Sequence, residues 1–265
     1  MEKNKVALND SKVAALGSVN GILFYDVIWP YFAVLIMKLL FLSNYQHLVN
    51  TKYYFMSLIL MVITSILTFV SAIIIAKPKN LIKAYGENSL SWNMVAACLG
   101  FNVYAHDKKK LFWKLVFACL GSMMLFSFMY NLLLVTMGLD IGGGNANQTN
   151  VVLLIKENAL LAFIAMVVLA PVLEEITYRY FLFGGIAKFN RKWAIVISGF
   201  IFMCVHGVAS FTQEVDNIFV ELLLLPPYMF SGMVLAYAYD KSENLAVSTS
   251  IHVLNNLISF VLCLL

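Results

Sequence analysis

Long apolar runs alternate with short polar segments along almost the whole chain of 265 residues. A helix needs about 20 predominantly apolar residues to cross the hydrocarbon core of a bilayer. Seven runs approach or exceed this length, and the charged loops between them leave no room for a sizeable soluble domain. The pattern predicts an all-α, polytopic transmembrane helix bundle with spans at 21–43, 54–76, 111–138, 159–183, 193–213, 217–239 and 245–264.

A further apolar segment, 90–105, lies between the second and third predicted spans. Asn93 and Asn102 interrupt this segment, and it is too short to cross the bilayer comfortably. It is compatible with an interfacial helix, a re-entrant segment or an eighth span, so the bundle has seven or eight spans. We expect N-terminal transmembrane helices with a cytoplasmic basic loop in 1–150, and a helical core that carries the chemistry in 151–265.

The composition agrees with a membrane protein and excludes several other classes. Hydrophobic residues make up 62% of the chain and charged residues 12%, whereas soluble domains usually carry about 25% charged residues. The net charge of +4 comes from lysines in loops beside the spans, which disfavours nucleic acid as a partner. The four cysteines have neither CxxC nor zinc-ribbon spacing, so we expect no disulfide framework.

Lys and Arg residues collect in alternate loops, and this asymmetry predicts the orientation. Seven lysines lie between 77 and 114, and the loop after the fourth span contains Lys188, Arg191 and Lys192. Short cytoplasmic loops collect such residues, so both stretches should be cytoplasmic. The amino terminus is then predicted inside, and the glycine-containing loop 138–150 and the carboxyl terminus outside.

The fourth predicted span contains three charged residues, Glu174, Glu175 and Arg179. A charge within a span costs at least about 2.5–3.5 kcal/mol, so each charge needs a partner, a water-filled cavity or a function. On a helix, Glu175 and Arg179 share a face, whereas Glu174 points about 100° away. We expect Glu175 to pair with Arg179 and Glu174 to face a cavity as a general base. The alternative is a buried ion-pair network without a catalytic role.

Two histidines occupy later predicted spans. His206 falls in the middle of the fifth span, and His252 in the seventh is followed one turn later by Asn256, whose amide can orient the imidazole or donate to an oxyanion. Each histidine alone is also compatible with ordinary helix packing. At about 1.5 Å rise per residue, these groups and Glu174 lie roughly 10–20 Å from the cytoplasmic ends of their spans. They should therefore converge on one layer in the cytoplasmic half of the membrane.

Such a layer supports hydrolysis. Glu174 would deprotonate a water, His206 would position it, and His252 with Asn256 would stabilise the developing oxyanion. Alternatively, Glu174, His206 and His252 could bind a divalent metal such as zinc, with a water as the fourth ligand. Glu174 could not then be both ligand and free base, and the sequence leaves both mechanisms open.

Other ionisable residues fall closer to the ends of the predicted spans. Asp26, Lys38 and Glu221 belong to this group. Side chains near the end of a span can reach the interface. We expect snorkelling for these three residues.

Three motifs follow one another in the C-terminal spans: EExxxR at 174–179, FxxxH at 202–206 and HxxxN at 252–256. In this order, they resemble the CPBP family of intramembrane proteases, which includes the type II CAAX prenyl endopeptidases and the bacterial Abi proteins linked to bacteriocin self-immunity. The resemblance covers about the last 110 residues. It implies a glutamate-dependent or metal-assisted endopeptidase. The implied catalytic residues are Glu174, His206, His252 and Asn256, with Glu175 and Arg179 completing the first motif.

The resemblance also sets expectations for partners and location. The implied substrate is a membrane-associated peptide or protein tail near the cytoplasmic face, such as a lipidated tail, a pheromone or a bacteriocin precursor. The expected location is a bacterial plasma membrane. Two rivals remain: a non-enzymatic immunity or regulatory scaffold, and a proton-coupled transporter. The transporter has no inverted repeat of broken helices in its favour.

Overall fold

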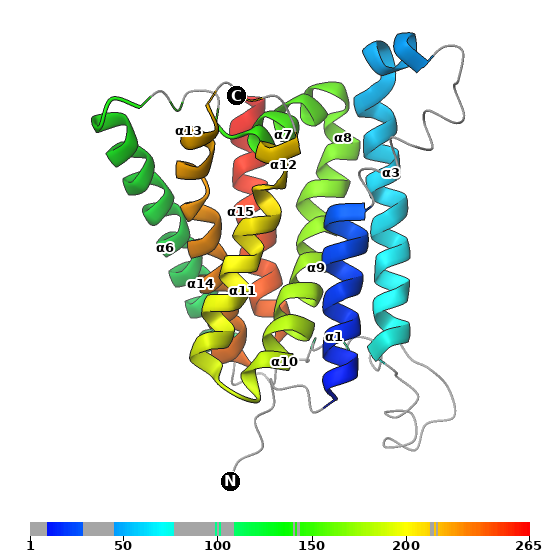
Figure 1. Ribbon diagram of the computed structural model, residues 1–265. Helices are drawn as coiled ribbons and strands as arrows, with labels where there is room; N and C mark the ends of the chain where they lie inside the picture. The colour runs from blue at the N-terminus through cyan, green and yellow to red at the C-terminus, as the bar shows by residue number, and fades with distance from the viewer. Residues whose placement is uncertain are drawn as a thin grey trace.

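The computed structural model describes residues 10–28, 45–76, 109–139, 144–212 and 217–265, together with residues 99, 101, 141 and 215. Every secondary-structure element in these residues is helical, which confirms the all-α prediction (Figure 1). Most of segment 90–105, the second part of the predicted first span and Lys38 lie outside the described residues. The eighth span therefore stays a prediction.

The helices follow one another along the chain as α1 (Ser11–Val19), η1 (Asn20–Ile28), α3 (Tyr45–Ala76), α6 (Lys109–Thr136), α7 (Ala146–Glu157), α8 (Ala159–Ala162), η3 (Phe163–Leu169), α9 (Ala170–Glu175), η4 (Ile176–Phe183), α10 (Gly184–Ala187), α11 (Arg191–His206), α12 (Val208–Thr212), α13 (Ile218–Leu223), α14 (Pro226–Ser242) and α15 (Leu245–Leu264). In η1, η3 and η4 the helix widens to π-type turns. The elements from α8 to α10 form one continuous helical run.

Five helical runs in the described residues are long and apolar enough to cross a membrane, which makes the chain a multi-pass integral membrane protein. These runs are Tyr54–Ala76, Lys110–Thr136, Ala159–Ala187, Ile218–Ser242 and Leu245–Leu264. They confirm five of the seven predicted spans. The predicted span 193–213 differs, because α11 has only 16 residues and the helix is interrupted at Gly207 before α12.

The helices run between two ends of the bundle (Figure 1). These ends differ in charge. At the end that we call the basic end, α1, α6, α11 and α15 begin and α3, α10 and α14 finish; Arg191 pairs there with Asp240 at 2.7 Å. At the opposite end, which we call the α7 end, lie α7, α12 and α13. The basic end carries Lys12, Lys109, Lys110, Lys114, Lys188, Arg191, Lys192 and Lys241 against Asp10, Asp240 and Glu243, and the α7 end carries Lys52, Lys156, Glu157 and Glu221.

Glu221 links three elements at the α7 end. Its carboxylate accepts hydrogen bonds from the backbone N–H of Ala146, at 3.0 Å, and from the hydroxyl of Ser210, at 2.5 Å. Snorkelling, which the sequence predicts for this residue, is therefore wrong. Glu221 instead joins α13 to the first turn of α7 and to α12.

Asparagine side chains fix where five of the described helices begin. An asparagine at this position accepts a hydrogen bond from a free backbone N–H of the first turn and stabilises the helix by about 1 kcal/mol. Because two of these caps set where α11 and α15 begin, they also set the heights of His206 and His252 in the bundle. The caps are Asn145 for α7, Asn158 for α8, Asn190 for α11, Asn217 for α13 and Asn244 for α15.

The helices α11 and α14 touch backbone to backbone at Gly199 and Gly232. A Cβ atom on Gly199 would lie 2.8 Å from the carbonyl oxygen of Met229, and one on Gly232 would lie 2.9 Å from the Cα of Gly199. Small residues allow this kind of close approach between helices in membranes. The contact places the α14 backbone against the helix that carries His206.

We expect Gly199→Ala to lower the stability of the protein by about 1–3 kcal/mol, because the added methyl group must separate two packed backbones. Gly121→Ala in α6 is the matched control, since a Cβ there meets nothing within 4 Å. Thermal unfolding of both variants in detergent measures the difference. Equal unfolding temperatures for the two variants would contradict this account of the packing.

Candidate active site

Glu175 at the end of α9 and Arg179 in η4 form a fully buried ion pair. Arg179 Nε lies 3.3 Å from Glu175 Oε2, and both side chains are 0% exposed. Arg179 also donates through Nη2 to the carbonyl oxygen of Gly232 at 3.2 Å, and its guanidinium carbon lies 4.9 Å from the centre of the Phe202 ring. The predicted pair is confirmed, and it holds η4 against both α11 and α14.

The imidazole of His252, in α15, lies between the two glutamates. Its Nδ1 lies 3.0 Å from Glu175 Oε1, and its Nε2 lies 3.6 Å from Glu174 Oε2. Glu175 accepts the Nδ1 hydrogen, because its carboxylate is already paired with Arg179. This bond fixes the orientation of the ring and leaves Nε2 facing Glu174, an arrangement that resembles a carboxylate–histidine couple in hydrolytic enzymes.

Asn256 does not orient His252, contrary to one of the roles that the sequence allows. Its Nδ2 donates instead to the carbonyl oxygen of Met166, at 3.0 Å. Met166 belongs to the π-type turn η3, just upstream of α9. Asn256 therefore joins α15 to the helical run that carries both glutamates.

His206 is the last residue of α11 rather than a residue in the middle of a span. Its Nδ1 lies 2.9 Å from the carbonyl oxygen of Phe202. Because a carbonyl oxygen only accepts, Nδ1 carries the hydrogen, and Nε2 of the neutral ring is left as an acceptor. The sequence missed the break at Gly207, since a single glycine inside an apolar run is also compatible with a continuous helix.

Phe202 separates the two histidines. Its ring centre lies 4.3 Å from that of His206 and 5.7 Å from that of His252. On its other side, the His206 ring stacks on Tyr228 at 4.7 Å. Both imidazoles thus pack against aromatic rings, which restrict the rotation of their side chains.

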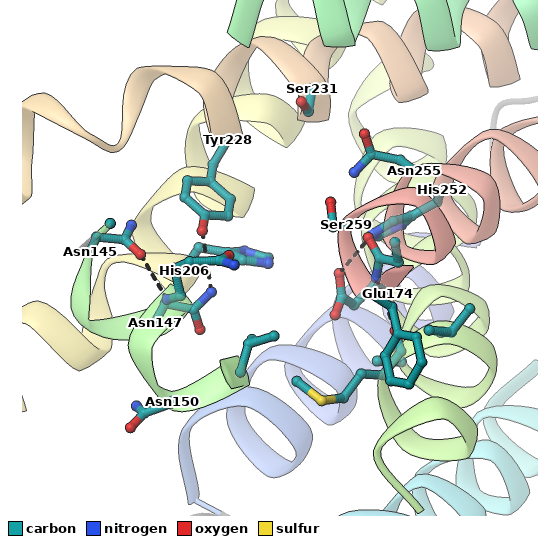
Figure 2. Close-up of a pocket in the computed structure, with 18 of the residues that line it drawn as sticks. Asn145, Asn147, Asn150, Glu174, His206, Tyr228, Ser231, His252, Asn255 and Ser259 are labelled. Atoms are coloured by element: carbon teal, nitrogen blue, oxygen red, sulfur yellow. Dashed lines mark hydrogen bonds and ion pairs between the residues drawn. The ribbon is translucent and has the colours of Figure 1, made fainter. Parts of the chain in front are cut away.

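A cavity of about 790 Å³ joins these groups. Ligand pockets usually measure about 300–1,000 Å³. Figure 2 shows Glu174 beside His252 on one side of the cavity and His206 next to Tyr228 on the other. The Glu174 side chain is 11% exposed, whereas that of Glu175 is 0% exposed. The two adjacent glutamates therefore separate as expected, with one facing the cavity and the other in the protein interior.

Comparison with known families agrees with this geometry. Residues 156–258 match the family described as type II CAAX prenyl endopeptidase Rce1-like. This part of the chain is therefore similar to the Rce1-like family. The matched residues include both glutamates, both histidines and Asn256, so the resemblance drawn from the three motifs is confirmed.

Two curated proteins are similar to parts of the chain. An uncharacterised protein of Mycoplasma capricolum is 30% identical over 142 residues, which are 51% of this chain and 38% of that protein. The UPF0177 protein YxdF of Lactococcus lactis is 28% identical over 85 residues, which are 32% of this chain and 40% of that protein. The chain thus spans about two fifths of the length of these relatives. No solved structure matches it.

Asp26 belongs to the same cavity, although the sequence predicts snorkelling for it. It lines the cavity from η1, and its Oδ2 accepts a hydrogen bond from the hydroxyl of Tyr178 at 2.6 Å. Tyr178 stands one turn after Glu174 on the same helical run. No local sequence signal could have found this contact, because the two residues are 152 positions apart.

The three-residue metal shell that the sequence allows is not assembled in the described residues. Within the described part of the chain, no three His, Cys, Asp or Glu side chains lie close enough together to hold a metal ion. Glu174 and His252 are neighbours, but His206 stands across the cavity with its ring against Tyr228 (Figure 2).

Proposed function

We propose that the protein is an intramembrane endopeptidase that hydrolyses a peptide bond of a membrane-associated peptide or protein segment. The observation that carries this proposal is the chain of contacts from Arg179 through Glu175 and His252 to Glu174 at the cavity wall. The first three groups hold one another in the interior. Glu174 is then the one carboxylate of the first motif that a water in the cavity can reach.

In the proposed reaction, Glu174 removes a proton from a water molecule, and the water oxygen bonds to the carbonyl carbon of the substrate. The carbonyl oxygen becomes an oxyanion. When this tetrahedral intermediate collapses, the carbon–nitrogen bond breaks, and the protonated Glu174 returns its proton to the leaving amine. The reaction is balanced with water as the only co-reactant.

The two histidines have different tasks in this proposal because different groups hold them. His206, whose Nδ1 donates to Phe202, can accept a hydrogen bond from the attacking water through Nε2. His252, whose Nδ1 is held by Glu175, presents Nε2 beside Glu174 and can donate to the oxyanion when both of its nitrogens are protonated. Asn256 supports the site by holding η3, and its oxyanion role stays a prediction.

We expect the purified protein to cleave members of a diverse peptide library in detergent, with new peptide termini detected by mass spectrometry. His206→Ala should lower the rate of appearance of these termini by about 10² or more, since it removes a group that positions the water. Lys192→Ala, an exposed change at the basic end, is the control. Equal cleavage by His206→Ala and the wild type would contradict the proposed mechanism. If the His206→Ala variant cleaves no peptide but keeps the biological activity of the wild type, the non-enzymatic scaffold is favoured.

A further inference from the structure

The two ends of the bundle differ in charge in the way that distinguishes the two sides of a membrane. The basic end carries eight Lys or Arg residues against three acidic residues in the described part of the chain, whereas the α7 end carries two lysines and two glutamates. Positive residues close to the ends of spans mark the cytoplasmic side. The basic end is therefore cytoplasmic, and the α7 end faces outward.

The cavity occupies the half of the bundle that lies towards the α7 end. Each long helix contributes lining residues from this half only: 54–64 of α3, 123–131 of α6, 227–235 of α14 and 252–262 of α15. The helix α7 and the two residues before it contribute a row of lining residues between 144 and 155. None of the eight basic residues at the basic end lines the cavity. Glu174 and His252 (Figure 2) thus lie at the inner limit of a space that extends away from the basic end.

The lining residues that reach the surface lie in the same half. Met124 and Asn131 on α6, and Ser259 and Leu262 on α15, line the cavity and are exposed. Beside them, Asn147 and Asn150 of α7 line the cavity and are partly exposed. The opening therefore lies between α6, α15 and α7.

We infer that the substrate reaches Glu174 from the extracytoplasmic side of the membrane. The inference rests on the proposed peptidase function for its substrate, and on charge and cavity geometry for the direction of access. It differs from the expectation drawn from the sequence, in which cleavage takes place near the cytoplasmic face. The substrate is then a peptide segment that has already been exported, or the outward-facing part of a membrane protein.

The cavity wall indicates which kind of segment fits. Its acidic and imidazole lining residues are Asp26, Glu174, His206 and His252, and none of the described lining residues is a Lys or Arg that could neutralise an acidic substrate. Asparagines from α6, α7 and α15 line it instead, together with Gln148. A primary amide both donates and accepts hydrogen bonds, which matches the N–H and C=O groups of an extended peptide. The preferred substrate is therefore an extended segment without acidic side chains.

Accessibility of single cysteines to a membrane-impermeant maleimide tests the direction of access. The background is a variant without Cys98, Cys119, Cys204 and Cys263, and the probe position is Ser231→Cys, which lies in the cavity wall on α14 (Figure 2). Lys192→Cys, exposed at the basic end, is the matched control. In right-side-out vesicles, Ser231→Cys should react about tenfold or more faster than in inside-out vesicles, and Lys192→Cys should show the opposite preference.

Faster reaction of Ser231→Cys from the inside, equal reaction from both sides, or no reaction at all would overturn the inference. Labelling requires no turnover, so the same measurement in a Glu174→Gln background separates access from catalysis. If Ser231→Cys is labelled from the outside but the protein cleaves no peptide, the inferred direction of access stands and the proposed peptidase function is rejected. If the protein cleaves peptides but Ser231→Cys is labelled from the inside, the peptidase function stands and the inferred direction of access is rejected.

Discussion

Glu174→Gln is expected to lower the rate of peptide hydrolysis by a factor of about 10²–10⁴, the usual contribution of a general base. The amide keeps the size of the carboxylate but cannot take a proton from water. It also preserves a hydrogen-bonding group opposite His252 Nε2, from which Glu174 Oε2 is now separated by 3.6 Å. Initial rates on a cleaved library peptide, compared with the wild type, give the factor.

Glu157→Gln is the matched control for this experiment. Glu157 is an exposed glutamate at the end of α7, outside the cavity lining. We expect it to cleave at the wild-type rate. Wild-type activity of Glu174→Gln, with an unchanged elution profile in detergent, would show that another group is the base.

Arg179→Met is expected to destabilise the protein by about 3–5 kcal/mol, because it leaves the carboxylate of Glu175 charged and buried without its main partner. Both side chains of this pair are 0% exposed, so water cannot replace the lost contact. Thermal unfolding in detergent measures the change. The double variant Glu175→Gln/Arg179→Met should recover much of the loss, since neither charge then remains in the interior.

Arg191→Met provides the control for the buried pair. Arg191 pairs with Asp240 at 2.7 Å, but its side chain is 44% exposed. Exposed pairs contribute about 0–1 kcal/mol, so this variant should unfold close to the wild-type temperature. Equal losses for Arg179→Met and Arg191→Met would mean that burial does not decide the strength of these two pairs.

Contacts within one helix could be predicted from the sequence. The spans near 54–76 and 245–264 depend only on the length of an apolar run, and both were recovered within the described residues. The ion pair between Glu175 and Arg179 depends only on their spacing of four residues. These features are local, so one segment at a time is enough to derive them.

Contacts between helices could not be predicted in the same way. His252 binds Glu175 across 77 residues of sequence, and Asn256 binds Met166 across 90. Helical spacing places Asn256 near His252, but the packing of α15 on η3 gives its amide a different partner. The motifs identified the residues of the site, whereas the choice of partners followed from how the helices pack.

The carboxylate of Glu175 contacts two groups. One oxygen pairs with Arg179, which stabilises the fold, and the other binds His252, which lies beside the proposed base. Stability and activity therefore depend on the same atoms. A screen for thermostable variants should therefore yield no substitution of Glu175, because a change that removes its contact with Arg179 also removes the carboxylate that holds the His252 imidazole. Gains in stability must therefore come from contacts far from the cavity, such as the helix starts or the surface of α6, which leave the proposed catalytic groups unchanged.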